Sequence, residues 1–384
     1  MSADLLPALY TPSGPPVVGG TSAGNRLTLI TDGNEAFRLA YEAIRQARTR
    51  VWLESYIVEP DEVGRPAIAA LAEAARRGCD VVLLFDRWGS PRLGRRHAAP
   101  ILEAGGRVAT FNPVLPWQKL GRKVASILHR DHRKILIADD VGFCGGRNIS
   151  VDYGGAGPAR FFDETVRLEG PCVRDLAHVF ADSFYDATGA SLALPPPPPP
   201  FPDGVPVAVL GLNARQQELD LKRAIHRLLQ HTRRSCYVMT PYFIPPRWFM
   251  NALCELARRG TDVRVLTAGH SDVPAARTAG RHLYGRLLRA GVRIFEHRHP
   301  ILHAKHLTLD DTVGIAGSYN VDRYGEKHNL EVGVIALDPA FTAQLNRTFF
   351  ERLHHAEEIT RSAWQRRTLA ARAAQWSLFQ LSRI

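Results

Sequence analysis

The sequence predicts an α/β fold made of two similar halves, each a mixed sheet flanked by helices, with a shared site in the cleft between them. Three observations support this prediction. Strand-like apolar runs alternate with helix-like segments, the second half repeats the order of the first, and each half contains one copy of a histidine motif. With 384 residues, 45% of them hydrophobic, the chain is also long enough for two domains with a sizeable core.

The first half is expected to span residues 26–190, after an irregular tail (1–25) that is rich in proline, glycine and serine. Helical apolar spacing marks its helices, and alternating or continuous apolar runs mark its strands. The predicted elements are, in chain order, a helix from Asn34, a strand at 51–58, a helix at 66–78, a strand within 80–90, a helix ending near Ala104, strands at 107–112 and 160–170, and a helix at 173–188. Their alternation predicts a parallel or mixed sheet covered by helices.

The second half is expected to span residues 207–364, after a linker (191–206) whose proline run is a stiff extended spacer. Its predicted elements are a helix at 216–231, a strand at 236–243, a helix at 246–259, a strand at 262–269, a helix at 274–290 and a strand at 292–297. Short repeats keep their order in both halves: Arg-Arg-Gly begins at 76 and at 258, which is 258 − 76 = 182 positions apart. This order indicates an internal duplication.

Charge and cysteine usage limit the class of protein. Lys and Arg outnumber Asp and Glu by 49 to 38, so the net charge of +11 favours an anionic partner: a phospholipid surface, a nucleic acid or a phosphorylated substrate. A protein that is basic without such a partner is the alternative. The five cysteines form no Cys-x-x-Cys pair, so we expect neither a zinc site nor a disulfide framework, and a reducing compartment is the simpler home. No signal peptide and no long apolar run is evident, so any membrane contact is expected to be peripheral.

The two histidine motifs share one spacing. The motif residues are His132, Lys134 and Asp139 in the first copy, and His303, Lys305 and Asp310 in the second. Side chains alternate along a strand, so each histidine and its lysine are expected to project to the same side. A glycine-containing turn follows each copy, where backbone groups can approach a ligand, and the predicted phosphate-binding side chains there are Asn148, Ser318 and Asn320.

Two half-sites related by pseudo-twofold symmetry can converge on one phosphorus atom. One histidine would attack it to form a phosphohistidine, and the other would protonate the departing alcohol. The lysines and asparagines would surround the non-bridging oxygens, and neither a metal nor a cofactor is required. Asp163 and Glu331 follow the motif histidines by 163 − 132 = 31 and 331 − 303 = 28 residues, and are candidates for fixing the histidine tautomers. The alternative for each carboxylate is an ordinary surface position.

The paired HxKxxxxD pattern, followed by Gly-Gly-x-Asn and Gly-Ser-x-Asn, resembles the phospholipase D superfamily, and the chain is most similar to bacterial cardiolipin synthases from about Asn34 to Trp364. The resemblance implies a metal-independent transfer of a phosphatidyl group from one phosphatidylglycerol to another, which releases glycerol. It implies that one motif histidine is the nucleophile and the other the acid and base, and of the two we take His132 as the nucleophile. It also implies that the motif aspartates are largely structural and that Asp163 and Glu331 orient the histidines. The first copy departs from the second, because it has one residue fewer between Asp139 and Gly145 than the second has between Asp310 and Gly317.

Two segments are candidates for lipid contact, and the expected location is the cytoplasmic face of the cell membrane. The connection between Asn112 and His132 mixes Trp117 with basic side chains, as interfacial segments do, but a packed loop is equally compatible. Residues 365–384 form a basic amphipathic segment that suits an anionic membrane surface, or a helix packed on the body.

Two other functions remain open at this point. A phosphodiesterase of the same superfamily would use water as the acceptor, on phospholipid or nucleic acid. A nucleic-acid-binding module without activity would explain the charge, but it has no use for two intact histidine and lysine pairs. The favoured partner is therefore anionic phospholipid, phosphatidylglycerol, at a membrane surface, with no nucleic acid.

Overall fold

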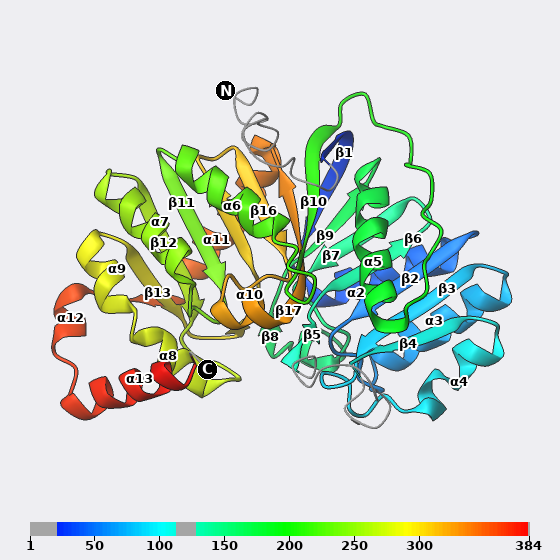
Figure 1. The fold of residues 1–384 in the computed structure, drawn as a ribbon, viewed down its shortest axis with the longest axis horizontal. Helices are drawn as coiled ribbons and strands as arrows, with labels where there is room; N and C mark the ends of the chain where they lie inside the picture. Colours follow the sequence, from blue (N-terminus) through cyan, green and yellow to red (C-terminus); the bar gives the residue numbers. More distant parts are fainter. Residues whose placement is uncertain (1–20, 113–127, 383–384) are drawn as a thin grey trace.

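The strands of both halves form one continuous mixed sheet in the computed structural model, which describes residues 21–112 and 128–382 (Figure 1). Outward from the centre, the first half contributes β1 (Thr21–Ile30), β9 (Thr165–Glu169), β7 (Val141–Gly145), β6 (Lys134–Ala138), β2 (Arg50–Ser55), β3 (Asp80–Asp86) and β4 (Arg107–Phe111). The second half contributes β10 (Val205–Asn213), β17 (Asn329–Ala336), β16 (Val313–Gly317), β15 (His306–Leu309), β11 (Ser235–Thr240), β12 (Asp262–Ala268), β13 (Arg293–His297) and β18 (Ala356–Glu358). Apart from β18, each strand of one half has a counterpart in the other, and the counterparts occur in the same order along the chain and across the sheet. The predicted fold class is therefore confirmed.

The central strands β1 and β10 join the halves by antiparallel pairing. The sequence did not predict either strand. β1 begins inside the expected tail and β10 inside the expected linker, because Thr21–Ile30 starts with small and polar residues and Val205 follows the prolines. Of the expected tail, residues 1–20 lie outside the described part of the chain.

Parallel strands in each half are connected by helices that cover the sheet. In the first half these are α2 (Gly33–Gln46), α3 (Gly64–Arg76) and α4 (Arg95–Glu103), and in the second α6 (Asp220–His231), α7 (Arg247–Arg258), α8 (Pro274–Arg281) and α9 (Tyr284–Ala290). One helix was predicted over 274–290. The backbone instead tightens at His282 and Leu283 into hydrogen bonds to the third residue back, which separates α8 from α9.

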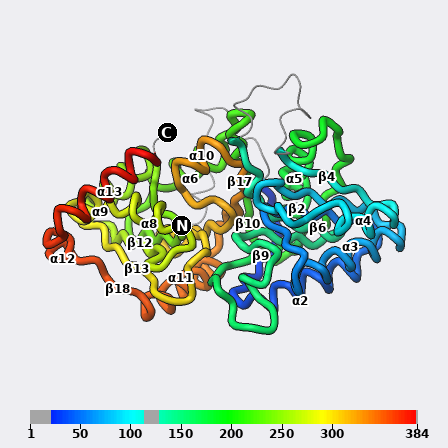
Figure 2. Tube along the Cα trace, turned by 90° about the horizontal axis from the view of Figure 1, so that it is seen from below, coloured from blue at the N-terminus to red at the C-terminus, as the bar shows by residue number. Residues whose placement is uncertain are grey.

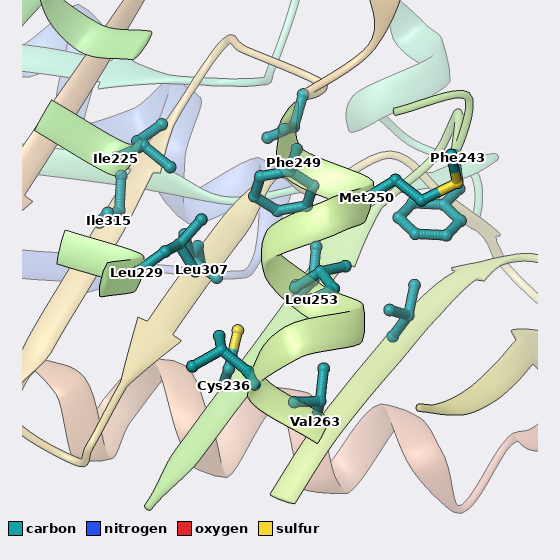
Figure 3. Packing of buried hydrophobic residues seen from close by; sticks show 14 of the residues in the cluster. Ile225, Leu229, Cys236, Phe243, Phe249, Met250, Leu253, Val263, Leu307 and Ile315 are labelled. Atoms are coloured by element: carbon teal, nitrogen blue, oxygen red, sulfur yellow. The ribbon is translucent and has the colours of Figure 1, made fainter. Parts of the chain in front are cut away.

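Helix α7 shows how sequence spacing becomes packing. Phe249, Met250 and Leu253 share one face of the helix and are buried against the sheet, close to Cys236 and Val263 (Figure 3). On other parts of the sheet, α5 (Cys172–Thr188) and α11 (Pro339–Leu353) pack into a cluster that contains strand residues of both halves. The halves therefore share a core.

The remaining elements are short segments at the junction of the halves and two C-terminal helices on the second half. They are β5 (Arg130–Asp131), the 3-10 turn η3 (Val151–Tyr153), β8 (Phe161–Phe162), β14 (Ile301–Leu302), α10 (Arg323–His328), α12 (Arg361–Gln365) and α13 (Leu369–Leu381). Helix α13 lies against α8 at the outer end of the second half (Figure 2). Leu378 and Phe379 pack on the core, whereas Leu369, Trp376 and Leu381 are exposed, so one face of the predicted amphipathic segment is packed and another is not.

Candidate active site

Two small strand pairs that cross between the halves position the site. β5 of the first half runs parallel to the start of β17, with Asp131 opposite Leu330. β14 of the second half runs parallel to β8, with Leu302 opposite Phe162. One residue further along each pair, the register brings each motif histidine beside a carboxylate of the other half. The histidines thus lie just before strands β6 and β15, where the sequence had suggested a position within the strand.

The imidazoles and carboxylates make direct contact at these positions. His132 Nδ1 lies 2.9 Å and 3.0 Å from the two carboxylate oxygens of Glu331, and His303 Nδ1 lies 2.6 Å from Asp163 Oδ2. Asp163 and Glu331 are fully buried, so the alternative of surface carboxylates is wrong. Each carboxylate follows the histidine of its own half in sequence but contacts the histidine of the other half in space.

Burial and neighbouring charge set the ionisation of these pairs. Burial lowers the pKa of both imidazoles, to about 4 for His303, where the charge of Lys305 adds to the effect. Burial alone would raise the pKa of Asp163 and Glu331, but the positive groups around them outweigh burial and hold both pKa values below the usual range. Each pair is therefore a neutral imidazole beside an ionised carboxylate, which keeps the ring proton on Nδ1 and leaves Nε2 as the basic nitrogen.

The motif lysines are buried next to their histidines. Lys134 Nζ donates to the backbone carbonyl of His132 at 2.7 Å, and Lys305 Nζ donates to the carbonyl of His303. Burial lowers the pKa of Lys134 to about 7, with a further contribution from the charge of Lys305, whose own pKa burial also lowers. Both ammonium groups are thus held close to the imidazoles.

The predicted phosphate-binding side chains fall in two groups. Asn148 and Asn320 line the same cavity as the histidines, and Asn148 Nδ2 donates to the hydroxyl of Tyr153 at 2.7 Å. Ser318 has a different contact: its hydroxyl donates to Glu331 and accepts the backbone N–H of Val332 at 3.0 Å. Ser318 therefore holds the carboxylate that contacts His132.

The motif aspartates lie at the far ends of strands β6 and β15 from the lysines. Asp139 accepts backbone hydrogen bonds from residues 48–50 at 2.8–3.0 Å, and Asp310 accepts them from residues 233–235 at 2.6–3.1 Å. Each aspartate fixes the turn between a helix and the next strand. The contacts match the structural role that the resemblance implied, and separate these residues from the histidines.

A cavity of about 1270 Å³ opens between the halves and contains the predicted groups His132, His303, Asn148 and Asn320. Its other walls are aromatic and aliphatic side chains mixed with a few charged ones. Such a lining suits a ligand that carries both a polar centre and apolar parts.

Aromatic residues that the sequence reasoning missed surround the imidazoles. Tyr56 and Tyr242 make edge contacts with His132 and His303, with ring centroids 5.3 Å and 6.4 Å apart. Both tyrosines follow equivalent strands, β2 and β11, so an alignment of the two halves would have pointed to them. Tyr153 contacts His303 at 5.4 Å, and no repeated pattern marks it.

A second buried pair beneath the site was also missed. His306 Nδ1 lies 2.8 Å from Glu164 Oε2, and both side chains are almost inaccessible. The segment 160–170 was predicted as one strand, whereas β8 and β9 are separated at Asp163 and Glu164, which turn toward the other half. A strand pattern alone does not reveal such a break.

Across residues 21–112 and 128–382, no three His, Cys, Asp or Glu side chains gather as a metal site. No helix in this part of the chain is both long and apolar enough to cross a bilayer. Most of the connection around Trp117 (113–127) lies outside the described residues.

Comparisons with known proteins agree with this geometry. A family model described as "Cardiolipin synthase, PLD-like domain" matches residues 225–353. The chain is 30% identical to a cardiolipin synthase of Geobacillus sp. (strain WCH70), over 92% of this chain and 71% of the relative. It is 31% identical to cardiolipin synthase B of Escherichia coli K12, over 84% and 79%. The crystal structure of a phosphatidylserine synthase from Haemophilus influenzae Rd KW20 superposes with a TM-score of 0.75 at 15% identity, covering 100% of this chain and 97% of that chain, which supports the fold.

Proposed function

Because the chain belongs to the phospholipase D superfamily and, within it, to the cardiolipin synthases, we propose that it transfers a phosphatidyl group from one phosphatidylglycerol to another. The observation that carries this proposal is the crossed pair of histidine–carboxylate contacts at one cavity. Two basic Nε2 atoms from different halves suit a reaction at a single phosphorus atom, where one imidazole attacks and the other transfers a proton.

In the first step, His132 Nε2 attacks phosphorus, a nitrogen–phosphorus bond forms, and the bond from phosphorus to the glycerol oxygen breaks. His132 is the better nucleophile candidate because its side chain is 12% exposed, against 6% for His303. His303, protonated on Nε2 when the anionic substrate is bound, gives that proton to the departing glycerol. Glu331 stabilises the positive charge that the His132 ring gains, as a buried carboxylate does in other histidine mechanisms.

In the second step, a hydroxyl of a second phosphatidylglycerol enters the position that glycerol leaves. His303 accepts the hydroxyl proton, the new oxygen–phosphorus bond forms, and the nitrogen–phosphorus bond to His132 breaks. The product is cardiolipin, and both imidazoles return to their starting forms.

The charge on the non-bridging oxygens would be stabilised by groups held in place before substrate binds. Lys134 and Lys305 are buried with their ammonium groups beside the imidazoles, and Asn148 and Asn320 line the cavity wall. Because these donors are fixed, little reorganisation is needed as charge moves, and loss of one such donor costs roughly 2.7–4 kcal/mol of transition-state stabilisation.

The cavity mouth is suited to a lipid surface, so we place the protein peripherally at the cytoplasmic face of the cell membrane. Ten large hydrophobic side chains are exposed in the described residues, and half of them line this one cavity. These five are Trp88, Leu128, Val273, Tyr324 and Leu381. Apolar groups at the mouth would let a lipid pass from the bilayer to the histidines without crossing water.

The decisive experiment incubates the protein with phosphatidylglycerol vesicles in EDTA and identifies the products by mass spectrometry. We expect cardiolipin and glycerol in equal amounts. Formation of phosphatidic acid without cardiolipin would instead assign water as the acceptor and the phosphodiesterase function. The variant carrying both His132→Ala and His303→Ala is the control, and full activity in it would rule out the mechanism.

A further inference from the structure

A second cavity, separate from the active-site histidines, is lined by several arginines. It has a volume of about 600 Å³ and is lined by residues of α7, α9, α12 and α13 in the second half. Its basic lining residues are Arg247, His282, Arg286, Arg289, Arg323, Arg367 and Arg372. No aspartate or glutamate contributes to its lining within the described residues. We call this cavity the arginine pocket.

The arginines of this pocket differ from others nearby. Arg277 and Arg281, on the adjacent α8, both form ion pairs with Glu296. None of the six pocket arginines has a carboxylate within ion-pair distance anywhere in residues 21–112 and 128–382. Six uncompensated charges are more than half of the net charge of +11, and they face one concave surface.

The pocket is built from ordered contacts. The Arg367 guanidinium lies 3.3 Å from the centroid of the Trp364 ring, and it donates to the backbone carbonyl of Trp364 and to the buried Gln375 side chain. Burial, followed by the charges of Arg372 and Arg281, lowers the pKa of Arg367 to about 10. The positive groups thus remain together although they repel one another, which is favourable when an anion binds between them.

Apolar side chains of α13 lie next to the arginines of the pocket. Trp376 and Phe379 line the pocket, and Trp376 and Leu369 are exposed on the same helix. Guanidinium groups match phosphate in shape and charge, and exposed Trp and Leu beside arginines are typical of a helix at a lipid interface. A phosphate group attached to apolar chains satisfies both features.

Helix α13 also forms a wall of the active-site cavity. Leu378 and Leu381 line that cavity, while Trp376 and Phe379 line the arginine pocket, and Arg323 lines both. A ligand that holds α13 at the bilayer would therefore hold the cavity mouth there too.

We propose that the arginine pocket is a non-catalytic binding site for the phosphate headgroup of an anionic phospholipid, and that it seats the cavity mouth on the membrane. The site goes beyond the transfer reaction, because it neither contacts the imidazoles nor requires turnover. It explains where the excess positive charge acts.

The test measures binding to vesicles of phosphatidylglycerol mixed with phosphatidylcholine by co-sedimentation. Arg247 and Arg289 are exposed and make no side-chain hydrogen bond or ion pair within the described residues, so replacing them should leave folding intact. We expect the variant Arg247→Gln/Arg289→Gln to bind about 30-fold more weakly, since each arginine near an anionic surface contributes about fivefold.

The matched control is Arg45→Gln/Arg347→Gln, which removes the same charge from exposed, unpaired arginines on α2 and α11. It should bind within about twofold of the unmodified protein, since charges that do not face the surface contribute little beyond a Debye length. Equal losses in both double variants, or wild-type binding by the pocket variant, would overturn the proposal. Circular dichroism establishes that all variants are folded.

Calorimetric titration with inorganic phosphate and with glycerol 3-phosphate separates a lipid headgroup from a soluble anion. Tight arginine-dependent binding of these small anions, with vesicle binding unaffected in the pocket variant, would overturn the phospholipid assignment. Because binding needs no turnover, the result is independent of whether the protein makes cardiolipin.

Discussion

The two half-sites share a plan but differ in their surroundings. In both, a histidine Nδ1 contacts a buried carboxylate of the other half, and a buried lysine donates to the backbone carbonyl of its own histidine. Among the described residues, His132 has one aromatic contact, with Tyr56, whereas Tyr153, Phe161 and Tyr242 all surround His303. The shared contacts set the tautomers, and the aromatic enclosure makes the second imidazole harder to reach.

The layer beneath the imidazoles differs more. Three residues after each histidine stand Ile135 in the first half and His306 in the second, and the residues after the two carboxylates are Glu164 and Val332. The duplication therefore places a buried hydrogen-bonded pair, His306 with Glu164, where the symmetric position has two aliphatic side chains of one cluster. A polar pair is not needed to close this interface, because the other copy has apolar side chains there.

The largest predicted effect is on the histidines. His132→Ala and His303→Ala should each lower the transfer rate on the order of 10⁴-fold, because one removes the nucleophile and the other the acid and base. The two variants should nevertheless differ. Mass spectrometry of rapidly quenched protein should find phosphohistidine at position 132 in His303→Ala.

The reciprocal variant is the control for this comparison. No covalent adduct should form at His303 in the His132→Ala protein. An adduct at His303 in that variant, or in the unmodified protein, would reverse the roles given to the two halves.

The next largest predicted effect is on the free energy of unfolding, and it concerns the buried pair of His306 and Glu164. Glu164→Val or His306→Ile alone should lower the free energy of unfolding by about 3–5 kcal/mol, because each leaves a buried polar partner unpaired. The double variant, which copies the aliphatic arrangement of the other half, should be more stable than either single variant. Urea denaturation of all three measures this.

Additive losses in the double variant would contradict the comparison, since they would mean that the two side chains act independently. Ile135→Ala tests the aliphatic counterpart. It should cost about 2–5 kcal/mol with no rescue from any partner, as for other buried aliphatic truncations.

These differences explain what sequence could and could not predict. The parallel strand β3 has a continuous apolar run, and β12 is mostly apolar, so the positions of both were predicted correctly. The central strands β1 and β10 were missed, because proline, glycine and polar residues interrupt their patterns. Parallel strands within a half can be predicted from local pattern, whereas the joint between the halves depends on long-range pairing.

The same reasoning applies to the site. Repeated spacing pointed to the histidines, to the lysines and to the two carboxylates that contact the histidines. It did not reveal that each carboxylate contacts the histidine of the other half. That contact follows from the parallel pairing of β5 with β17 and of β8 with β14, and β5, β8 and β14 have only two residues each. Ser318 was taken for a phosphate ligand since glycine turns often bind phosphate, but its hydroxyl is used by Glu331.

A smaller effect is expected from the orienting carboxylates. Glu331→Gln and Asp163→Asn should each lower the rate about 10²-fold or more, since an amide can neither stabilise an imidazolium nor fix the ring proton on Nδ1. The crossing predicts which step each change slows. Glu331→Gln should slow formation of the phosphohistidine at His132, whereas Asp163→Asn should slow both its formation and its breakdown, because His303 transfers a proton in each step. Rapid-quench kinetics measures both rates.

Asp139→Asn and Asp310→Asn are matched controls, because they also remove a carboxylate charge but hold turns remote from the imidazoles. They should lower stability and retain most of the activity. An unchanged rate of phosphohistidine breakdown in Asp163→Asn would show that this carboxylate does not act through His303.

The smallest predicted effect is a pH dependence of kcat/KM that distinguishes Lys134 from Lys305. Burial lowers the pKa of Lys134 to about 7, so the ammonium charge that stabilises the phosphate oxygens is present below this pH and is lost above it. The value of kcat/KM, which reports the free enzyme, should therefore fall as the pH rises through about 7, by up to tenfold for each further unit. Lys134→Arg keeps its charge at every accessible pH, so this fall should disappear, whatever the rate of the variant at its optimum. Lys305→Arg should keep the fall, because Lys134 is still present. An unchanged profile in Lys134→Arg would assign the titration to another group that must be protonated, with Lys305, whose pKa burial also lowers, the first to test by the same measurement.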